Sequence, residues 1–174
     1  PYRLTLGLRN LLQKAESPRV INVVSGGMYT QKLKVDALLN AEGEKYSGSV
    51  AYAREKRALM VVTQAWAKDW AELGIVVNAM HPGWADTPGV QDALPDFRKL
   101  TGKILRTPAQ GADTIYWLAA ATEAGEVSGE LFLDRLAHSP YLLNSTRETA
   151  EERQRLLNFL SKFGSKVQRA RKSA

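Results

Sequence analysis

The sequence predicts an α/β protein in which a parallel sheet is covered by helices on both faces. Short apolar runs rich in β-branched residues alternate with longer segments of helical periodicity, in the order α, β, α, β, α, β, α. The short runs are apolar at nearly every position. We therefore expect strands buried on both faces, as parallel sheets require.

The first helix and the first strand are predicted before residue 25. Residues 2–14 carry a single leucine stripe at helical spacing, which Ser17-Pro18 ends. Residues 19–24 (RVINVV) predict a buried strand that leads into the turn Ser25-Gly26-Gly27. Residues 28–48 form a long irregular segment with a short helix at 35–39, and long loops are often functional.

Residues 49–73 predict the main helix, with Ser49 as its N-cap and Gly74 as its stop. Its apolar surface is wider than one stripe, so it needs more than one packing partner. We expect this helix to pack on the sheet and on a second helix. The second helix could come from another subunit, and the chain is expected to form a homo-oligomer through residues 2–14 and 49–73.

The second half of the chain continues the alternation. Residues 75–80 predict a strand, which is followed by the turn of residues 81–88. Further helices are expected at 94–105, from Thr107-Pro108 to about 122, and at about 146–163, with a strand at 130–134 and a loop after it. We divide the chain into a domain of residues 1–145 and a C-terminal helix with a basic tail, residues 146–174.

Composition narrows the possible function. The formal charge of the 174 residues is +6, but five basic residues lie in the last 13 positions, as expected of a frayed tail rather than a nucleic-acid-binding surface. There is no cysteine, no His/Asp/Glu cluster with metal spacing, no apolar run long enough to cross a membrane and no visible signal peptide. We expect a cytoplasmic protein with no metal, no nucleic-acid partner and no membrane span.

The chemistry is predicted at Tyr52-Ala53-Arg54-Glu55-Lys56. Residues four apart share a helix face, so Lys56 lies one turn beyond Tyr52. A neighbouring cation lowers the pKa of a phenol from about 10, and such a phenol can exchange a proton with an alcohol or a carbonyl oxygen. By itself the spacing is more typical of a solvated surface pair. The prediction gains weight from Ser25 and Pro82-Gly83, each of which follows a predicted strand.

Together these features resemble the short-chain dehydrogenase/reductase family. The stretches HPGWADTPGV and SGGMYTQKL are similar to its retinol-dehydrogenase-like branch, which includes dehydrogenase/reductase member 12, and the likeness covers roughly residues 1–135. The resemblance implies a Rossmann-like doubly wound parallel sheet and a nicotinamide cofactor, NAD or NADP. It also implies a reaction that interconverts an alcohol and a ketone or aldehyde.

The resemblance also implies roles for matching residues. Tyr52 would be the acid/base, Lys56 would hold the nicotinamide ribose hydroxyls, and Ser25 would hydrogen-bond the small alcohol or carbonyl substrate. The cofactor would be lined by Pro82, Gly83, Ala85 and Thr87. Trp84 and His81 are expected to be structural, His138 to be exposed, and Met28 and Tyr29 to face substrate or to anchor their loop.

Two departures from the family pattern bear on function. The 27-residue interval from Ser25 to Tyr52 is long, and we interpret residues 28–48 as an insert lining the substrate side. The Gly-rich phosphate-binding turn is absent and is expected upstream of Pro1, with the N-terminal strands. One alternative is therefore a truncated, non-catalytic segment that serves as a structural or oligomerising unit. A nucleic-acid binder that uses the basic tail is the remaining, weaker alternative.

Overall fold

A four-stranded sheet lies at the centre of the computed structural model, which describes residues 1–39, 46–86 and 105–172. In spatial order the strands are Arg19–Val23 (β1), Val76–Met80 (β2), Leu131–Leu133 (β3) and Leu136–His138 (β4). β1 pairs with β2, and β2 with β3, in parallel, while β4 is antiparallel to β3. The expected parallel sheet is confirmed, but the segment after β3 is a strand rather than a loop.

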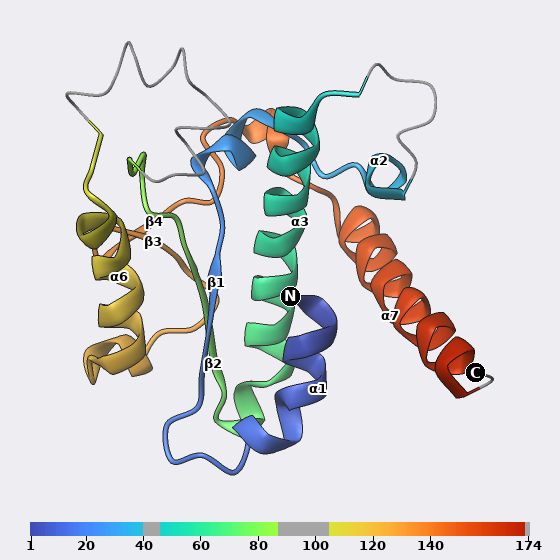
Figure 1. Ribbon diagram of the computed structural model, residues 1–174, viewed down its shortest axis with the longest axis horizontal. Coiled ribbons are helices and arrows are strands. Elements are labelled where there is room, and N and C mark those ends of the chain that lie inside the picture. Colours follow the sequence, from blue (N-terminus) through green and yellow to red (C-terminus); the bar gives the residue numbers. More distant parts are fainter. Residues whose placement is uncertain (40–45, 87–104, 173–174) are drawn as a thin grey trace.

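Helices cover both faces of this sheet, as the sequence predicts (Figure 1). The main helix α3 lies against one face and α6 against the other, and α1 and α7 lie on the α3 side (Figure 1). The α-helices span Tyr2–Leu12 (α1), Val35–Leu39 (α2), Gly48–Asp69 (α3), Pro108–Ala120 (α6) and Ala150–Lys172 (α7). Short 3₁₀ turns occupy Gly26–Thr30 (η1), Ala71–Leu73 (η2), Glu123–Gly125 (η3) and Asn144–Thr146 (η4).

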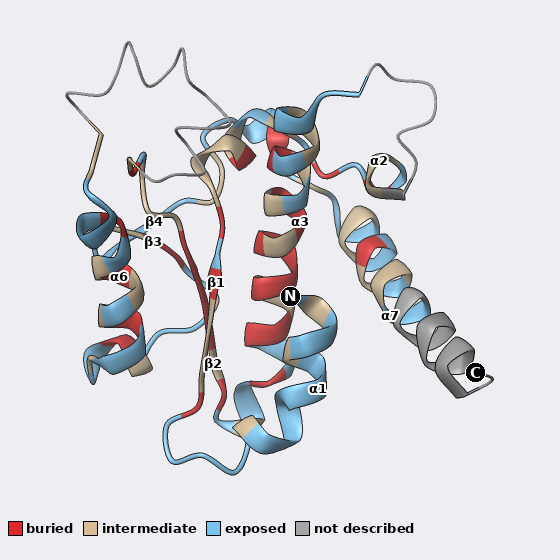
Figure 2. Cartoon of the chain, in the orientation of Figure 1, coloured by how far each residue is buried: buried red, intermediate tan, exposed pale blue. Residues whose placement is uncertain are grey.

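The core on the α3 side explains why this helix is apolar on more than one side. Trp66 stacks on Trp70, the C-cap of α3, at 5.0 Å and on Tyr2 of α1 at 5.4 Å between ring centroids. Leu156 of α7 is fully buried in the same cluster. Buried residues therefore run along α3 between the sheet and the neighbouring helices (Figure 2). The second helical partner that the sequence requires is supplied within the chain.

Several helix boundaries differ from the predictions. Ser47, in an extended conformation, precedes α3, so Ser49 lies inside the helix rather than at its N-cap. α7 begins at Ala150 and continues to Lys172, through the segment expected to be a frayed tail. The start of α6 is confirmed, because the Thr107 and Gln110 side chains each bond the other's backbone N–H in a capping box before Pro108. The helix predicted at 94–105 lies almost wholly outside the described residues.

The hairpin between β3 and β4 depends on a two-residue turn. Asp134 and Arg135 both have positive φ values, of 52° and 61°, as a type I′ turn requires. Neither residue is the Asn or Gly that usually marks such a turn. Side-chain bonds stabilise it, because Asp134 pairs with Arg106 and Arg135 pairs with Asp113. This explains why the sequence pattern alone did not predict β4.

The bend after β2 contains a glycine that no other residue could replace without strain. Gly83 has φ +71°, and a Cβ atom on it would lie 2.7 Å from Nε and 2.9 Å from Cζ of Arg106. That guanidinium cannot move away freely, because both its terminal nitrogens bond the Asp134 carboxylate. The Pro82-Gly83 bend and the Arg106–Asp134 ion pair are therefore packed as one unit.

We predict that Gly83→Ala lowers the free energy of unfolding by about 1–3 kcal/mol, through strain at positive φ and the clash with Arg106. Gly74→Ala is the matched control, since Gly74 has φ +68° with nothing within 4 Å of an added Cβ. It should cost only the left-handed strain, about 1–2 kcal/mol. Urea unfolding of both variants measures the difference. Equal losses would mean that the contact with Arg106 contributes nothing.

Candidate active site

The loops that carry the predicted site residues meet at one edge of the sheet. Val23 is aligned with Met80 in the parallel β1–β2 pair, so Ser25 and Pro82 each lie two residues past an aligned pair. The Val24 N–H donates to the Met80 carbonyl at 2.8 Å and extends the pairing by one bond. A Cβ on Gly26 would lie 3.9 Å from Cε1 of His81, which places the two loops side by side.

Tyr52 and Lys56 lie on α3 beside this edge. The Lys56 ammonium lies 5.3 Å from the centroid of the Tyr52 ring and donates a 2.9 Å hydrogen bond to the Val23 carbonyl. Burial lowers the pKa of Lys56, and the charge of Glu55 offsets part of that effect. The Tyr52 side chain is about half exposed, at 49%. The cation is thus fixed to the end of β1 while the phenol remains accessible.

Ser25 lies two residues after β1 and is the N-cap of the η1 turn. It is extended (φ −142°, ψ 146°), and its hydroxyl accepts a 3.2 Å hydrogen bond from the Gly27 N–H. A Cβ on Gly27 would lie 3.6 Å from Oγ of Ser25 and 3.7 Å from Cβ of Ala53, the residue after Tyr52. The turn that holds Ser25 therefore packs against the part of α3 that holds Tyr52 and Lys56.

The predicted cofactor-lining residues Pro82, Gly83 and Ala85 lie on the bend after β2. A Cβ on Gly111 of α6 would lie 3.0 Å from Cβ of Ala85 and 3.5 Å from Cβ of Pro82, so the helix packs closely against the bend. Ala85 is buried, whereas Trp84, which we expected to pack, is 48% exposed. Thr87, the last predicted cofactor residue, lies outside the described residues.

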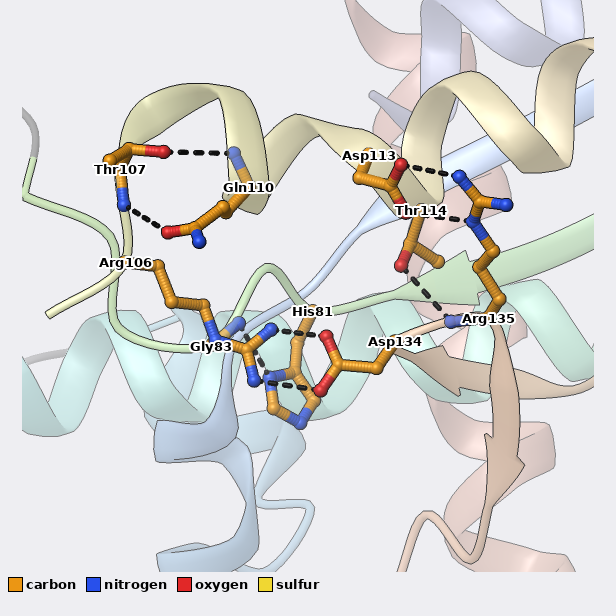
Figure 3. A network of polar contacts seen from close by, with 9 residues as sticks. All are labelled: His81, Gly83, Arg106, Thr107, Gln110, Asp113, Thr114, Asp134 and Arg135. Atoms are coloured by element: carbon orange, nitrogen blue, oxygen red, sulfur yellow. Dashed lines mark hydrogen bonds and ion pairs between the residues drawn. The ribbon is translucent and has the colours of Figure 1, made fainter. Parts of the chain in front are cut away.

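His81 supports the bend from below. Its Nδ1 accepts a 3.2 Å hydrogen bond from the Gly83 N–H, and its ring meets the Tyr29 ring edge-on at 6.2 Å (Figure 3 shows the Gly83 bond). Burial lowers the pKa of His81, the nearby His138 and Arg106 lower it further, and Asp134 raises it. The uncharged imidazole that accepts this bond agrees with the expected structural role. His138 is exposed, as expected.

The structure separates the two possible roles of Met28 and Tyr29. Met28 is fully buried with Val24, Met60, Ala79 and Leu131, so it anchors its loop in the core. The Tyr29 hydroxyl donates a 3.0 Å hydrogen bond to the carbonyl of Ser139, which ties the same loop to the segment after β4. Both contacts favour the anchoring role.

Charged residues that the sequence analysis did not single out surround the bend. Figure 3 shows Arg106 reaching from the segment before α6 to Asp134, and Arg135 reaching back to Asp113 on α6. The Arg106 backbone also bonds Trp84 and Asp86, at 2.8 Å in each case, and forms a bridge with Ala85. Arg106 and Asp134 are 28 residues apart, so no local sequence pattern predicts that they pair, and the fold is needed to reveal it.

Within the ranges 1–39, 46–86 and 105–172, no three side chains of the His, Cys, Asp and Glu types are grouped so that they could hold a metal ion. Over the same ranges, no helix combines the length and apolar character needed to cross a bilayer.

We predict that the His81 environment makes the fold less stable in mild acid. Because the pKa of His81 is lower in the folded state than its unfolded value of about 6.5, the unfolded chain binds more protons below that pH. This stability contribution is complete above pH 6.5 and is lost as the pH falls towards the folded pKa. Urea unfolding between pH 7.5 and 5.5 measures the slope.

In that experiment His81→Asn, whose amide oxygen can still accept from Gly83, should flatten the slope. His138→Asn should retain most of it, because that imidazole is exposed. A slope that is identical in the wild type and in His81→Asn would contradict the assignment.

Comparison with known proteins agrees with this architecture. Residues 37–130 match the family model described as enoyl-(acyl carrier protein) reductase. The chain is 42% identical over 164 residues to human dehydrogenase/reductase SDR family member 12, covering 93% of this chain and 51% of the relative. It is 32% identical over 140 residues to human retinol dehydrogenase 14, covering 76% of this chain and 41% of that protein.

Solved structures show the same likeness. The 3-alpha-hydroxysteroid dehydrogenase from Pseudomonas sp., determined in complex with NADH, aligns with a TM-score of 0.60 and 25% identity over 74% of this chain and 58% of that one. The chain spans about half the length of the curated relatives it matches. On its sequence, its sheet and its site-bearing loops, the chain belongs to the short-chain dehydrogenase/reductase family.

Proposed function

We propose that this chain is the C-terminal part of an NAD- or NADP-dependent oxidoreductase that interconverts a small alcohol and its ketone or aldehyde. The observation that carries the proposal is the position of Lys56, held between the Tyr52 ring and the Val23 carbonyl at the carboxyl edge of the sheet. Ligands of open α/β sheets bind at this edge. Membership of a family of dehydrogenases and reductases supports the same reaction class.

In this proposal Tyr52 moves the proton. Its half-exposed phenol gives a proton to the oxygen of a carbonyl being reduced, or takes one from an alcohol being oxidised. Lys56 places a positive charge beside the ring. Ser25, at the end of β1, donates a hydrogen bond to the same substrate oxygen and so fixes its direction.

The residues present fit a nicotinamide cofactor. An ammonium has three N–H donors, and the bond to Val23 occupies one, so Lys56 has donors to offer the ribose hydroxyls. Pro82, Gly83 and Ala85 lie on a bend that Arg106 and His81 hold in place, and together with Thr87 they would line the nicotinamide. A bound nicotinamide supplies or accepts the hydride, and the protein orients it and moves the proton.

The second candidate is a structural unit without activity of its own. It is favoured by the exposed leucines of α1, Leu4 and Leu11, which offer an apolar surface for association. Fluorescence titration of the full-length protein with NADH and NADPH separates the two candidates. Saturable binding supports a working cofactor site, whereas no binding of either dinucleotide favours the structural unit.

The cytoplasmic location stays a prediction.

We predict that Tyr52→Phe in the full-length protein lowers turnover about 10²- to 10⁴-fold, the usual contribution of a positioned acid/base. Cofactor affinity should change little, because the phenol acts on the substrate oxygen. The measurement is the oxidation of NADH or NADPH with a panel of aldehydes and ketones, followed by the absorbance at about 340 nm. Tyr116→Phe is the control, since that side chain is 74% exposed on α6. Equal turnover in the wild type and Tyr52→Phe would refute the assignment.

We also propose that the chain forms a homo-oligomer, with α1 and the exposed side of α3 as its interface. α1 contains no buried residue, and Leu4 and Leu11 are 69% and 64% exposed. Exposed apolar stripes of this kind mark contact surfaces. Light scattering should give at least twice the mass of one chain, and Leu4→Glu with Leu11→Glu should lower it to a monomer. A wild-type monomer would rule the interface out.

A further inference from the structure

Arg57, the residue after Lys56, is a charged side chain with no exposed surface. Its guanidinium donates three hydrogen bonds to backbone carbonyls, to Pro140 at 2.8 Å, Met28 at 3.0 Å and Gln31 at 3.3 Å. Burial of a guanidinium is costly unless its donors are satisfied. A planar fork of donors on separate nitrogens suits three carbonyls spread over two segments, whereas a lysine has all its donors on one nitrogen.

Two of those carbonyls belong to the segment that begins at Ser25. The Met28 carbonyl accepts from Arg57, and the Met28 N–H donates to the Ser25 carbonyl at 3.0 Å. A chain of two hydrogen bonds therefore connects Arg57 to Ser25. Ala53, one turn earlier on the same face of α3, packs against Gly27 in the same turn.

Lys56 and Arg57 consequently hold both sides of Ser25. Lys56 bonds the Val23 carbonyl, two residues before Ser25, and Arg57 bonds the Met28 carbonyl, three residues after it. Consecutive helix residues point about 100° apart, so they can reach the strand end and the far side of the turn separately. The position of Ser25 relative to α3 depends on both bonds.

The segment after β4 in turn holds Arg57 in place. The guanidinium lies 4.9 Å from the centroid of the Tyr141 ring, and Arg147 lies over the same ring at 4.7 Å. The Tyr141 hydroxyl donates to Glu148 at 2.5 Å, and Arg153 of α7 pairs with the same carboxylate at 2.7 Å. The Glu148 side chain has no exposed surface.

We propose that Arg57 is the positioning residue of Ser25, and that residues 139–153 hold Arg57 in the conformation that keeps the Ser25 turn against the part of α3 that carries Tyr52 and Lys56. The catalytic meaning of this arrangement rests on the proposed oxidoreductase function. The positioning itself does not, and it can be measured without turnover.

Amide hydrogen exchange tests the positioning in the full chain. Arg57→Lys should accelerate exchange at the Met28 and Gly27 amides by about tenfold or more, because their turn loses its attachment to α3. The Val24 amide, bonded to Met80 in the sheet, should be unaffected. Arg9→Lys makes the same chemical change at an exposed position and should change none of the three. Uniform acceleration, or none, in Arg57→Lys would overturn the proposal.

A double-mutant cycle tests the consequence for catalysis with the best aldehyde or ketone of the panel. If Arg57 acts through Ser25, Arg57→Lys should lower kcat about tenfold or more in the wild type but less than about threefold in a Ser25→Ala background. The affinity for NADH or NADPH should change little. Additive losses would show that Arg57 supports stability only and would overturn the catalytic part.

The positioning of Ser25 can still be tested if Arg57→Lys does not fold or if the oxidoreductase proposal fails. If Arg57→Lys does not fold, Tyr141→Leu replaces it, since it removes the stacked ring and leaves the three carbonyl bonds available. It should give the same local exchange pattern with a smaller amplitude, and unchanged exchange at Met28 would refute the role of residues 139–153. If Tyr52→Phe retains turnover, the oxidoreductase proposal fails, while the exchange result still decides the positioning.

Discussion

The arrangement of the site depends on the parallel pairing of β1 with β2. Parallel alignment brings the carboxyl ends of both strands to the same edge, and the register sets Val23 opposite Met80. A shift of one residue would turn the side chains of β1 to opposite faces, so the cores that Val20 and Ile21 contact fix this register. Ser25 and Pro82 are therefore placed by backbone pairing, and α3 needs only to present Tyr52 and Lys56 to the edge that already exists.

Polar groups in the interior bind the layers together. The buried Asn22 amide donates to the Thr63 hydroxyl at 2.9 Å and joins β1 to α3. Arg19 donates to the Leu118 and Ala121 carbonyls at the end of α6, where the helix has no intrahelical donors left for them. Such side chains lie at the junctions between elements, where apolar packing alone would not define one alignment.

The sequence was sufficient to predict the elements that have a strong local pattern. The apolar runs before Ser25 and His81 predicted β1 and β2, and Thr107-Pro108 predicted the start of α6, because each signal lies within a few residues. β4 was missed because Asp134 and Arg135 take positive φ without the usual Asn or Gly. Arg57 was missed because its partners Met28 and Pro140 are distant in sequence. A buried arginine looks like any exposed one until the fold is known.

β1 is the first strand of the sheet among the described residues, so only one of its sides faces another strand. The backbone N–H and C=O groups of its outer side form a template on which a further strand could dock. A parallel segment from the same polypeptide, or from another copy, would lengthen the sheet there and shield Arg19–Val23 from solvent. Without such a segment, the purified chain can associate edge to edge through β1. Low protein concentration, or a charged residue introduced on β1, would reduce this association.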